Sequence, residues 1–202
     1  MKKIPTLFER VFENHKKVGI LPNVTPGMEW VLEGEGVATE KMDGSCCAII
    51  DGVFYKRYDA KRGKTPPAGA IPCCEPDSVT GHWVKVNPED RGDMWHMAAY
   101  RNSNGEALAD GTYEVIGPHF RNNPHGLEAD VLVKHGEHIL EDVPRSFEGI
   151  RDYLQEHYME GIVFWRDEEP RCKIKRSDFG FKWNEAKVQK NIFSAPNSFC
   201  CQ

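Results

Sequence analysis

The strongest indication of the fold lies in residues 36–59, GVATEKMDGSCCAIIDGVFYKRYD. SCCAII and VFYKRY flank Asp51-Gly52, and Asp-Gly between two strand-like segments is a strong signal for a tight β-hairpin turn. We expect GVATEKMDG, residues 36–44, to enter as a further strand. Lys41 would then stand beside an Asp-Gly pair at the mouth of the hairpin. Five basic residues follow it, namely Lys56, Arg57, Lys61, Arg62 and Lys64.

Further strands are expected along the rest of the chain. The β-branched and aromatic residues typical of strands recur in 81–86, 111–118 and 130–140, and in a hairpin formed by 160–166 and 171–177. Helical spacing of apolar residues predicts helices over 5–14 and 146–158, the second with Ser146 as its N-cap, and a closing helix within 179–193. Segments 19–30 and 64–78 are rich in Pro and Gly and are expected to be irregular.

This order of elements predicts the fold class. Many antiparallel strands, few helices and no βαβ alternation favour an α+β fold built on antiparallel sheets flanked by helices. The 202 residues suit a single domain spanning 1–202.

Charge and composition narrow the function classes. A net charge of −5 and a pI near 5.9 argue against binding nucleic acid over the whole surface. The basic clusters at 56–64 and 171–176 favour a local site for an anion, with two solvated faces as the alternative. No long apolar run and no signal-peptide pattern are present, so we expect a soluble cytoplasmic protein that binds no membrane.

The seven cysteines include three adjacent pairs, at 46–47, 73–74 and 200–201. Adjacent cysteines are poor disulfide partners, so reduced thiols are expected. A zinc site formed by Cys73, Cys74 and His82 is an alternative, although structural zinc ligands are usually spaced by two to four residues.

Several charged residues occupy strand positions that need a partner. Lys173 and Lys175 are two apart, so both side chains should point to one face of the sheet while Cys172 and Ile174 point to the other. Two adjacent lysines on a covered face would need an anion such as phosphate. Glu114 and Glu160 are each flanked by apolar residues, which indicates either an exposed strand position or an acid that is paired or holds a metal.

Four short motifs in order resemble a known superfamily. EKMDG (40–44) resembles the KxDG motif of the covalent nucleotidyltransferases, which include ATP-dependent ligases and mRNA capping enzymes. YEVIG (113–117), EGIVFW (160–165) and KIK (173–175) resemble motifs III, IV and V of that superfamily. Within it, ATEKMDGSCC, GPHFRNNPHGL and KIKRSDFGFKW are most similar to RNA ligases of the RNA ligase 1 group, particularly the small 5′–3′ RNA ligases. The resemblance covers most of 38–183.

This resemblance implies a fold, a reaction and residue roles. The fold would be a nucleotidyltransferase (adenylation) domain. Lys41 would attack the α-phosphate of ATP to form lysyl–AMP; AMP would pass to an RNA 5′-phosphate, and an RNA 3′-hydroxyl would displace it. Mg²⁺ or Mn²⁺ would assist. The implied nucleotide site includes Glu40, at the adenine amino group, Asp43 of the KxDG motif, and Arg57, at the ribose or phosphate. Glu114 and Glu160 would contact the ribose or the metal, and Lys173 and Lys175 would contact the phosphates.

Departures from the superfamily bear on the choice between its members. The sequence ends soon after KIK, so no appended OB domain is expected, which favours an RNA ligase over a DNA ligase or capping enzyme. Cys46 stands where some RNA ligases have a polar residue, so its role is not implied. A GTP-dependent guanylyltransferase of the capping type and a non-catalytic module that binds RNA ends are the alternatives.

Overall fold

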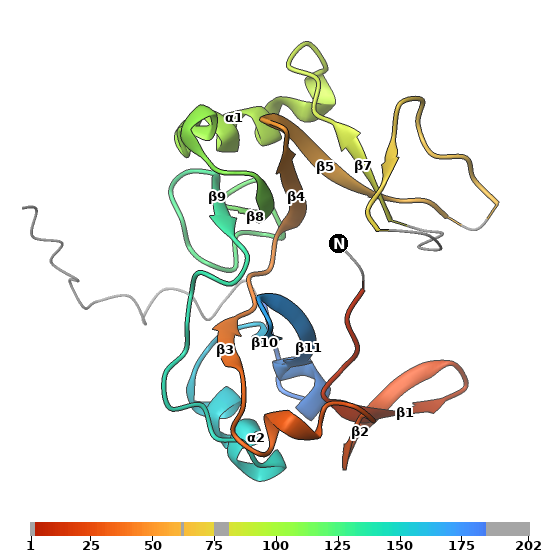
Figure 1. Cartoon of the computed structure of the whole chain (residues 1–202), viewed down its shortest axis with the longest axis vertical. Coiled ribbons are helices and arrows are strands. Elements are labelled where there is room, and N and C mark those ends of the chain that lie inside the picture. Colours follow the sequence, from red (N-terminus) through yellow and green to blue (C-terminus); the bar gives the residue numbers. More distant parts are fainter. Residues whose placement is uncertain (1–2, 62, 75–80, 185–202) are drawn as a thin grey trace, which may run out of the picture.

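The computed structural model describes residues 3–61, 63–74 and 81–184. It contains two sheets, one above the other in Figure 1, and a separate N-terminal hairpin. Pairing within each sheet is antiparallel, and helices are few, so the predicted α+β class with antiparallel sheets is confirmed.

The larger sheet has six strands and lies in the upper part of Figure 1. Apolar side chains from this sheet and from helix α1 (Met94–Asn102) form a core that includes Ile49, Phe54 and Val115. In spatial order the strands are β6 (Ile71–Pro72), β7 (Gly81–Lys85), β5 (Val53–Asp59), β4 (Ser45–Ile50), β8 (Gly111–Ile116) and β9 (Val131–Lys134).

The smaller sheet has three strands, in the order β11 (Glu169–Lys175), β10 (Gly161–Arg166) and β3 (Val37–Glu40). Helix α2 (Phe147–Glu156) packs on it through Ile150 and Leu154, both fully buried. Ser146 accepts a hydrogen bond from the Gly149 N–H, so the predicted N-cap of this helix is confirmed.

The Asp51-Gly52 turn between β4 and β5 is also confirmed. Both residues have positive φ, 50° and 69°, as a type I′ turn requires. The preceding strand, in contrast, ends at Glu40, and residues 41–44 pass from the smaller sheet to the larger one. Gly44 makes this passage possible, because a Cβ atom there would lie 2.0 Å from the Val115 carbonyl oxygen. Lys41 is thus fixed between the two sheets.

The helix predicted over 5–14 is wrong. Strands β1 (Phe8–Glu13) and β2 (Lys16–Val24) form a hairpin instead, so the irregular segment predicted from residue 19 is wrong as far as Val24. Asn14 and His15 have φ values of 49° and 62°, which suit a tight turn of this hairpin. Tertiary contacts reinforce it, because Arg10 and Lys17 both pair with the buried carboxylate of Asp178.

Other elements differ from expectation in extent. Helix α1 was not predicted, and β9 ends at Lys134 although a strand to residue 140 was expected. The predicted closing helix is absent from residues 180–184, and its remainder lies outside the described residues. Within the described part, no helix is both long and apolar enough to cross a membrane. Short 3-10 helices occur at Glu29–Val31 (η1), Arg91–Asp93 (η2), Gly105–Ala107 (η3) and Arg176–Phe179 (η4).

Candidate active site between the two sheets

A pocket of about 510 Å³ lies between the two sheets and is lined by residues of both. This volume is within the range typical of small-molecule sites, about 300–1,000 Å³. Six of the eight predicted site residues line it, so segments far apart in sequence converge here. The six are Glu40, Lys41, Arg57, Glu114, Lys173 and Lys175.

Glu160 lies behind the pocket and holds two of its lysines. Its side chain is only 6% exposed, and its Oε2 lies 2.6 Å from Lys41 Nζ. Its Oε1 lies 2.5 Å from Lys175 Nζ. The Lys41 backbone N–H also donates to the Gly161 carbonyl at 2.9 Å, so both the main chain and the side chain of Lys41 are anchored to the start of β10. Each carboxylate oxygen of Glu160 thus has its own ammonium partner.

Lys173 is the third lysine of the pocket. The predicted alternation along β11 is confirmed: Cys172 and Ile174 are fully buried in the core, whereas Lys173 and Lys175 face the pocket. Burial lowers the pKa of Lys173 to about 8, and the charges of Lys41, Lys175 and Arg10 add to this effect. An anion in the pocket would stabilise its charged form.

Glu40 and Arg57 line the pocket from different sheets. Burial raises the pKa of Glu40, against the opposing effect of His138, whose Nδ1 lies 3.9 Å from the carboxylate. Arg57 comes from β5, and its Nε donates to Asp59 at 2.9 Å. The guanidinium is held by this pair while lining the pocket.

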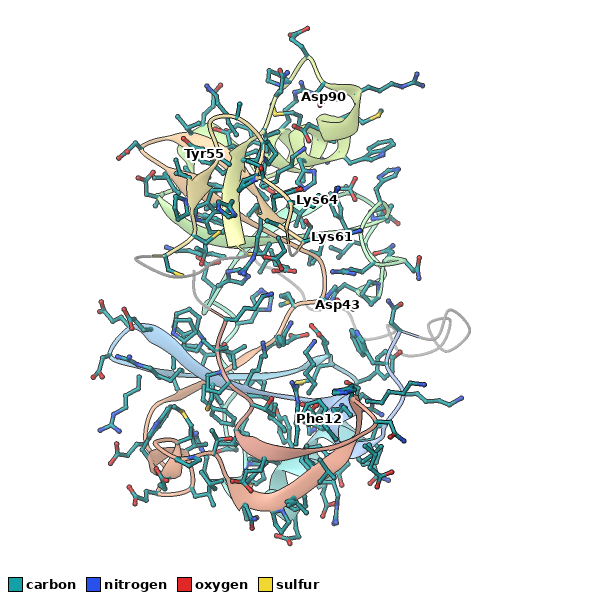
Figure 2. All side chains as sticks on the ribbon, turned by 90° about the vertical axis from the view of Figure 1, so that its right-hand side faces the viewer. Phe12, Asp43, Tyr55, Lys61, Lys64 and Asp90 are labelled. Carbon is teal, nitrogen blue, oxygen red and sulfur yellow. The ribbon has the colours of Figure 1, made fainter. Side chains whose placement is uncertain are left out.

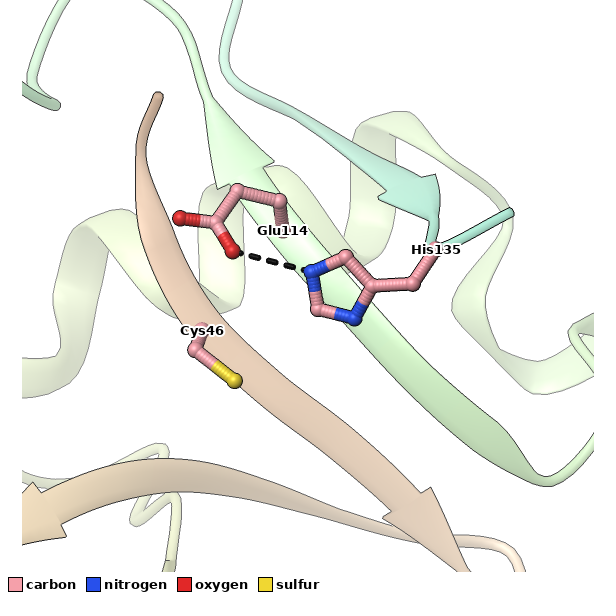
Figure 3. Close-up of side chains that lie close together, drawn as sticks. All are labelled: Cys46, Glu114 and His135. Atoms are coloured by element: carbon pink, nitrogen blue, oxygen red, sulfur yellow. Dashed lines mark hydrogen bonds and ion pairs between the residues drawn. The ribbon is translucent and has the colours of Figure 1, made fainter. Parts of the chain in front are cut away.

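Glu114 is held on the larger sheet beside two residues that were not predicted to join it. Its Oε1 accepts a hydrogen bond from the Gly44 N–H at 3.0 Å, and its Oε2 lies 3.0 Å from His135 Nε2. Cys46 lies close to both side chains (Figure 3). Burial, followed by the charge of Glu114, raises the pKa of the Cys46 thiol to about 12.

Asp43 does not line the pocket, although it lies between the two halves of the molecule (Figure 2). Its Oδ2 accepts a hydrogen bond from Trp183 Nε1 at 2.8 Å, and its N–H donates to His125 Nε2 at 3.2 Å. Arg121 Nε lies 3.9 Å from its Oδ1. Through these contacts, Asp43 connects the segment that carries Lys41 to the loop containing His125 and to Trp183 near the end of the described residues.

Sequence reasoning missed three of these partners, His125, His135 and Trp183. His125 and Trp183 lie in GPHFRNNPHGL and KIKRSDFGFKW, so similarity was their only signal. His135 had no signal, because its partner Glu114 is 21 positions away on another strand.

The two predicted basic clusters do not act as units. Lys56 pairs with the buried Asp93, and Lys61 and Lys64 are exposed. Arg171 pairs with Asp167 and Glu169 on the surface. Arg176 donates to the backbone carbonyls of Leu154, His157 and Lys182 and packs over the rings of Tyr158 and Phe181. Among the described members of the two clusters, Arg57, Lys173 and Lys175 line the pocket.

None of the described cysteines is joined to another in a disulfide. Within the described ranges, Cys73, Cys74 and His82 do not lie close enough together to count as a group of metal donors, so the alternative zinc site gains no support.

Part of the chain is similar to a known RNA ligase. No model of a known protein family matches the chain. The chain is similar to RNA ligase 1 of Danio rerio, with 28% identity over 140 residues. The match covers 54% of this chain and 43% of that protein, so the chain spans less than half the length of this relative. The similarity therefore supports a relationship to RNA ligases.

Proposed function

We propose that this protein is an ATP-dependent RNA ligase that joins RNA 5′-phosphate and 3′-hydroxyl ends through a lysyl–AMP intermediate. The observation that carries the proposal is the convergence of Lys41, Lys173 and Lys175 in one pocket of nucleotide size, with Glu160 behind them. The partial similarity to RNA ligase 1 supports the choice of RNA as the acceptor.

In this proposal Lys41 is the nucleophile. Its neutral amine attacks the α-phosphorus of ATP, a P–N bond forms, and pyrophosphate leaves. Glu160 Oε2, at 2.6 Å, aims the Lys41 side chain, pairs with its ammonium form before the reaction and is placed to accept the proton that the amine loses. The approaching phosphates are stabilised by Lys173 and Lys175, because fixed cations in a partly buried site stabilise developing negative charge without reorganisation. The AMP then moves to the RNA 5′-phosphate, and a 3′-hydroxyl displaces it.

The pocket offers complementary groups for the base and the sugar. Ile4, Met42 and Val163 supply an apolar wall. The Glu40 carboxylate can accept a hydrogen bond from the adenine amino group, whereas guanine presents an acceptor oxygen at the same position. Arg57, held by Asp59, is placed for the ribose or a phosphate. These features favour ATP over GTP.

Mg²⁺ or Mn²⁺ is proposed to enter with ATP. In nucleotide sites Mg²⁺ is held by one or two carboxylates together with the phosphates. Glu114 lines the pocket and fits this role, and we propose it as the protein ligand. Glu160 fits less well, because each of its oxygens already meets a lysine, so its contact with a metal would require Lys41 to move away.

One experiment tests the nucleotide and the nucleophile together. The protein is incubated with labelled ATP or labelled GTP, resolved on a denaturing gel, and the labelled peptide is sequenced by mass spectrometry. We expect label from ATP alone, on Lys41, and none in Lys41→Ala or Lys41→Arg, since a guanidinium does not deprotonate. Lys64→Ala, at an exposed lysine outside the pocket, is the matched control. Label from GTP would make the protein a guanylyltransferase, label on Lys173 would move the nucleophile, and absence of label would leave an RNA-end-binding module.

A second experiment tests the acceptor. If Lys41 serves only to carry AMP, Lys41→Ala should fail with ATP and 5′-phosphorylated RNA but still seal RNA that is already adenylated at its 5′ end. Wild-type protein that forms lysyl–AMP yet seals no pre-adenylated RNA would be a nucleotidyltransferase with a different acceptor.

A further inference from the structure

Three side chains with different donor atoms meet in the wall of the pocket. Cys46 on β4 and Glu114 on β8 are directly opposite each other in the sheet register, and His135 follows β9, the next strand. Figure 3 shows the three side chains close together on these elements, with Glu114 and His135 joined by a dashed line. Among the described residues they are the group of three donors close enough to hold a metal ion. Neither the sequence motifs nor the proposed ligase reaction uses them as a set.

The donor distances suit one bound ion. The Cys46 sulfur, a Glu114 oxygen and a His135 ring nitrogen all lie within 4.8 Å of one another. Tetrahedral zinc, with bonds of about 2.0–2.3 Å, separates its ligand atoms by roughly 3.3–3.8 Å. The Cys46 sulfur therefore needs to approach the other two donors by no more than about 1.5 Å, whereas Glu114 Oε2 and His135 Nε2, 3.0 Å apart, need to separate slightly. Rotation of the Cys46 and Glu114 side chains can supply both movements.

The surroundings already orient two of the three ligands. His135 Nδ1 lies 3.0 Å from the Thr112 hydroxyl, which leaves Nε2 directed at Glu114. Glu114 Oε1 accepts from the Gly44 N–H, which leaves Oε2 directed at the cluster. Metal-binding histidines and carboxylates are usually held in this way, by a hydrogen bond to the atom that does not bind the ion.

The donor chemistry selects a soft ion. A thiolate and an imidazole favour Zn²⁺ over Mg²⁺, which takes oxygen ligands. The local charges permit a dication. Arg57 lies beside Cys46 and pairs with Asp59. Zn²⁺ and Arg57 would carry three positive charges, which the carboxylates of Glu114 and Asp59 and a Cys46 thiolate would balance. Cys46, Glu114 and His135 all line the pocket, so a fourth coordination position would face its interior.

We propose that Cys46, Glu114 and His135 form a Zn²⁺ site with three protein ligands and an open fourth position. Because it depends only on these donors, the site stands whether or not the chain is a ligase. It is distinct from the proposed Mg²⁺ of ATP in its ligand types, although the two ions would compete for Glu114. The alternative is a hydrogen-bonded Glu114–His135 pair that merely joins β8 to the segment after β9.

The test is a titration of the full, reduced chain with Co²⁺, followed by absorbance and then by displacement with Zn²⁺. We expect one Co²⁺ per chain, visible ligand-field bands and a near-ultraviolet thiolate-to-cobalt band, all removed by Zn²⁺. Cys46→Ser should lose the near-ultraviolet band, and His135→Ala should weaken Zn²⁺ binding by at least about tenfold. Circular dichroism of each variant checks that it is folded.

Two controls separate this site from the other thiols. Cys74→Ser changes a half-buried cysteine outside the cluster and should leave the spectrum unchanged. Cys200→Ser/Cys201→Ser removes an adjacent pair of thiols that could also bind zinc, and it should be equally silent. A cobalt band that persists in Cys46→Ser, or wild-type protein that binds no Co²⁺, would overturn the proposal in favour of the hydrogen-bonded pair.

Discussion

Replacement of Lys173 by methionine tests the electrostatics of the pocket through protein stability. Lys173 carries its ammonium group beside Lys41, Lys175 and Arg10, and burial and these charges lower its pKa from 10.5 to about 8. A fall of about 2.5 in pKa, at about 1.4 kcal/mol for each unit, corresponds to roughly 3.4 kcal/mol of destabilisation of the charged form. Methionine has a similar length and no charge. After allowance for solvent screening of this half-buried group and for lost ammonium contacts, Lys173→Met should raise the free energy of unfolding at pH 7 by about 2 kcal/mol.

The destabilisation caused by Lys173 depends on pH. Below pH 8 the folded and unfolded states both carry the Lys173 proton, so the full destabilisation is present. Between pH 8 and pH 10.5 the folded state loses its proton first, and the destabilisation declines as the pH rises. The advantage of Lys173→Met should therefore be largest at pH 7 and fall to less than half by about pH 9.5.

Urea unfolding followed by tryptophan fluorescence at both pH values measures these differences. Lys64→Met, at an exposed lysine outside the pocket, is the control and should change the free energy of unfolding by less than about 0.5 kcal/mol. A destabilised Lys173→Met at pH 7, or an advantage that does not change with pH, would refute the electrostatic account of the pocket.

Three further predictions concern other parts of the site. Gly44→Ala should reduce the free energy of unfolding by about 3 kcal/mol in urea melts, because the new Cβ would meet the Val115 carbonyl oxygen at 2.0 Å. Trp183→Phe removes the hydrogen bond to Asp43 and should slow AMP transfer to the protein roughly tenfold in a labelling time course, since the motif segment loses an anchor. Affinity for ATP, measured by calorimetry, should fall as the pH rises through about 8. The pKa of Lys173 in the folded state lies there, and the neutral amine does not attract phosphate. Lys173→Arg should remove this pH dependence of the affinity.

Each of these has an outcome that contradicts it. Gly19→Ala is the matched control for Gly44→Ala, since a Cβ at Gly19 has nothing within 4 Å; equal losses in the two variants would exclude the steric explanation. An unchanged labelling rate in Trp183→Phe would make its bond to Asp43 purely structural. ATP affinity that is constant from pH 7 to pH 9 would place the phosphates away from Lys173.

Local features of the sequence were sufficient to predict the structure wherever the relevant contacts lie within one strand, one turn or one helix end. The alternation of Lys173 and Lys175 against Cys172 and Ile174 follows from the two-residue period of a strand. The Asp51-Gly52 turn follows from residues that accept positive φ, and the start of α2 follows from the hydroxyl of Ser146.

The tertiary structure alone decided which distant residues meet. Lys41 and Glu160 are 119 positions apart, and they pair because β3 lies beside β10 in the smaller sheet. Sheet order is set by packing of whole faces, which no short segment encodes. The error at 5–14 has the same origin: a short amphipathic segment is compatible with helix and strand alike, and pairing with β2 together with the anchors of Arg10 and Lys17 at Asp178 selects the strand.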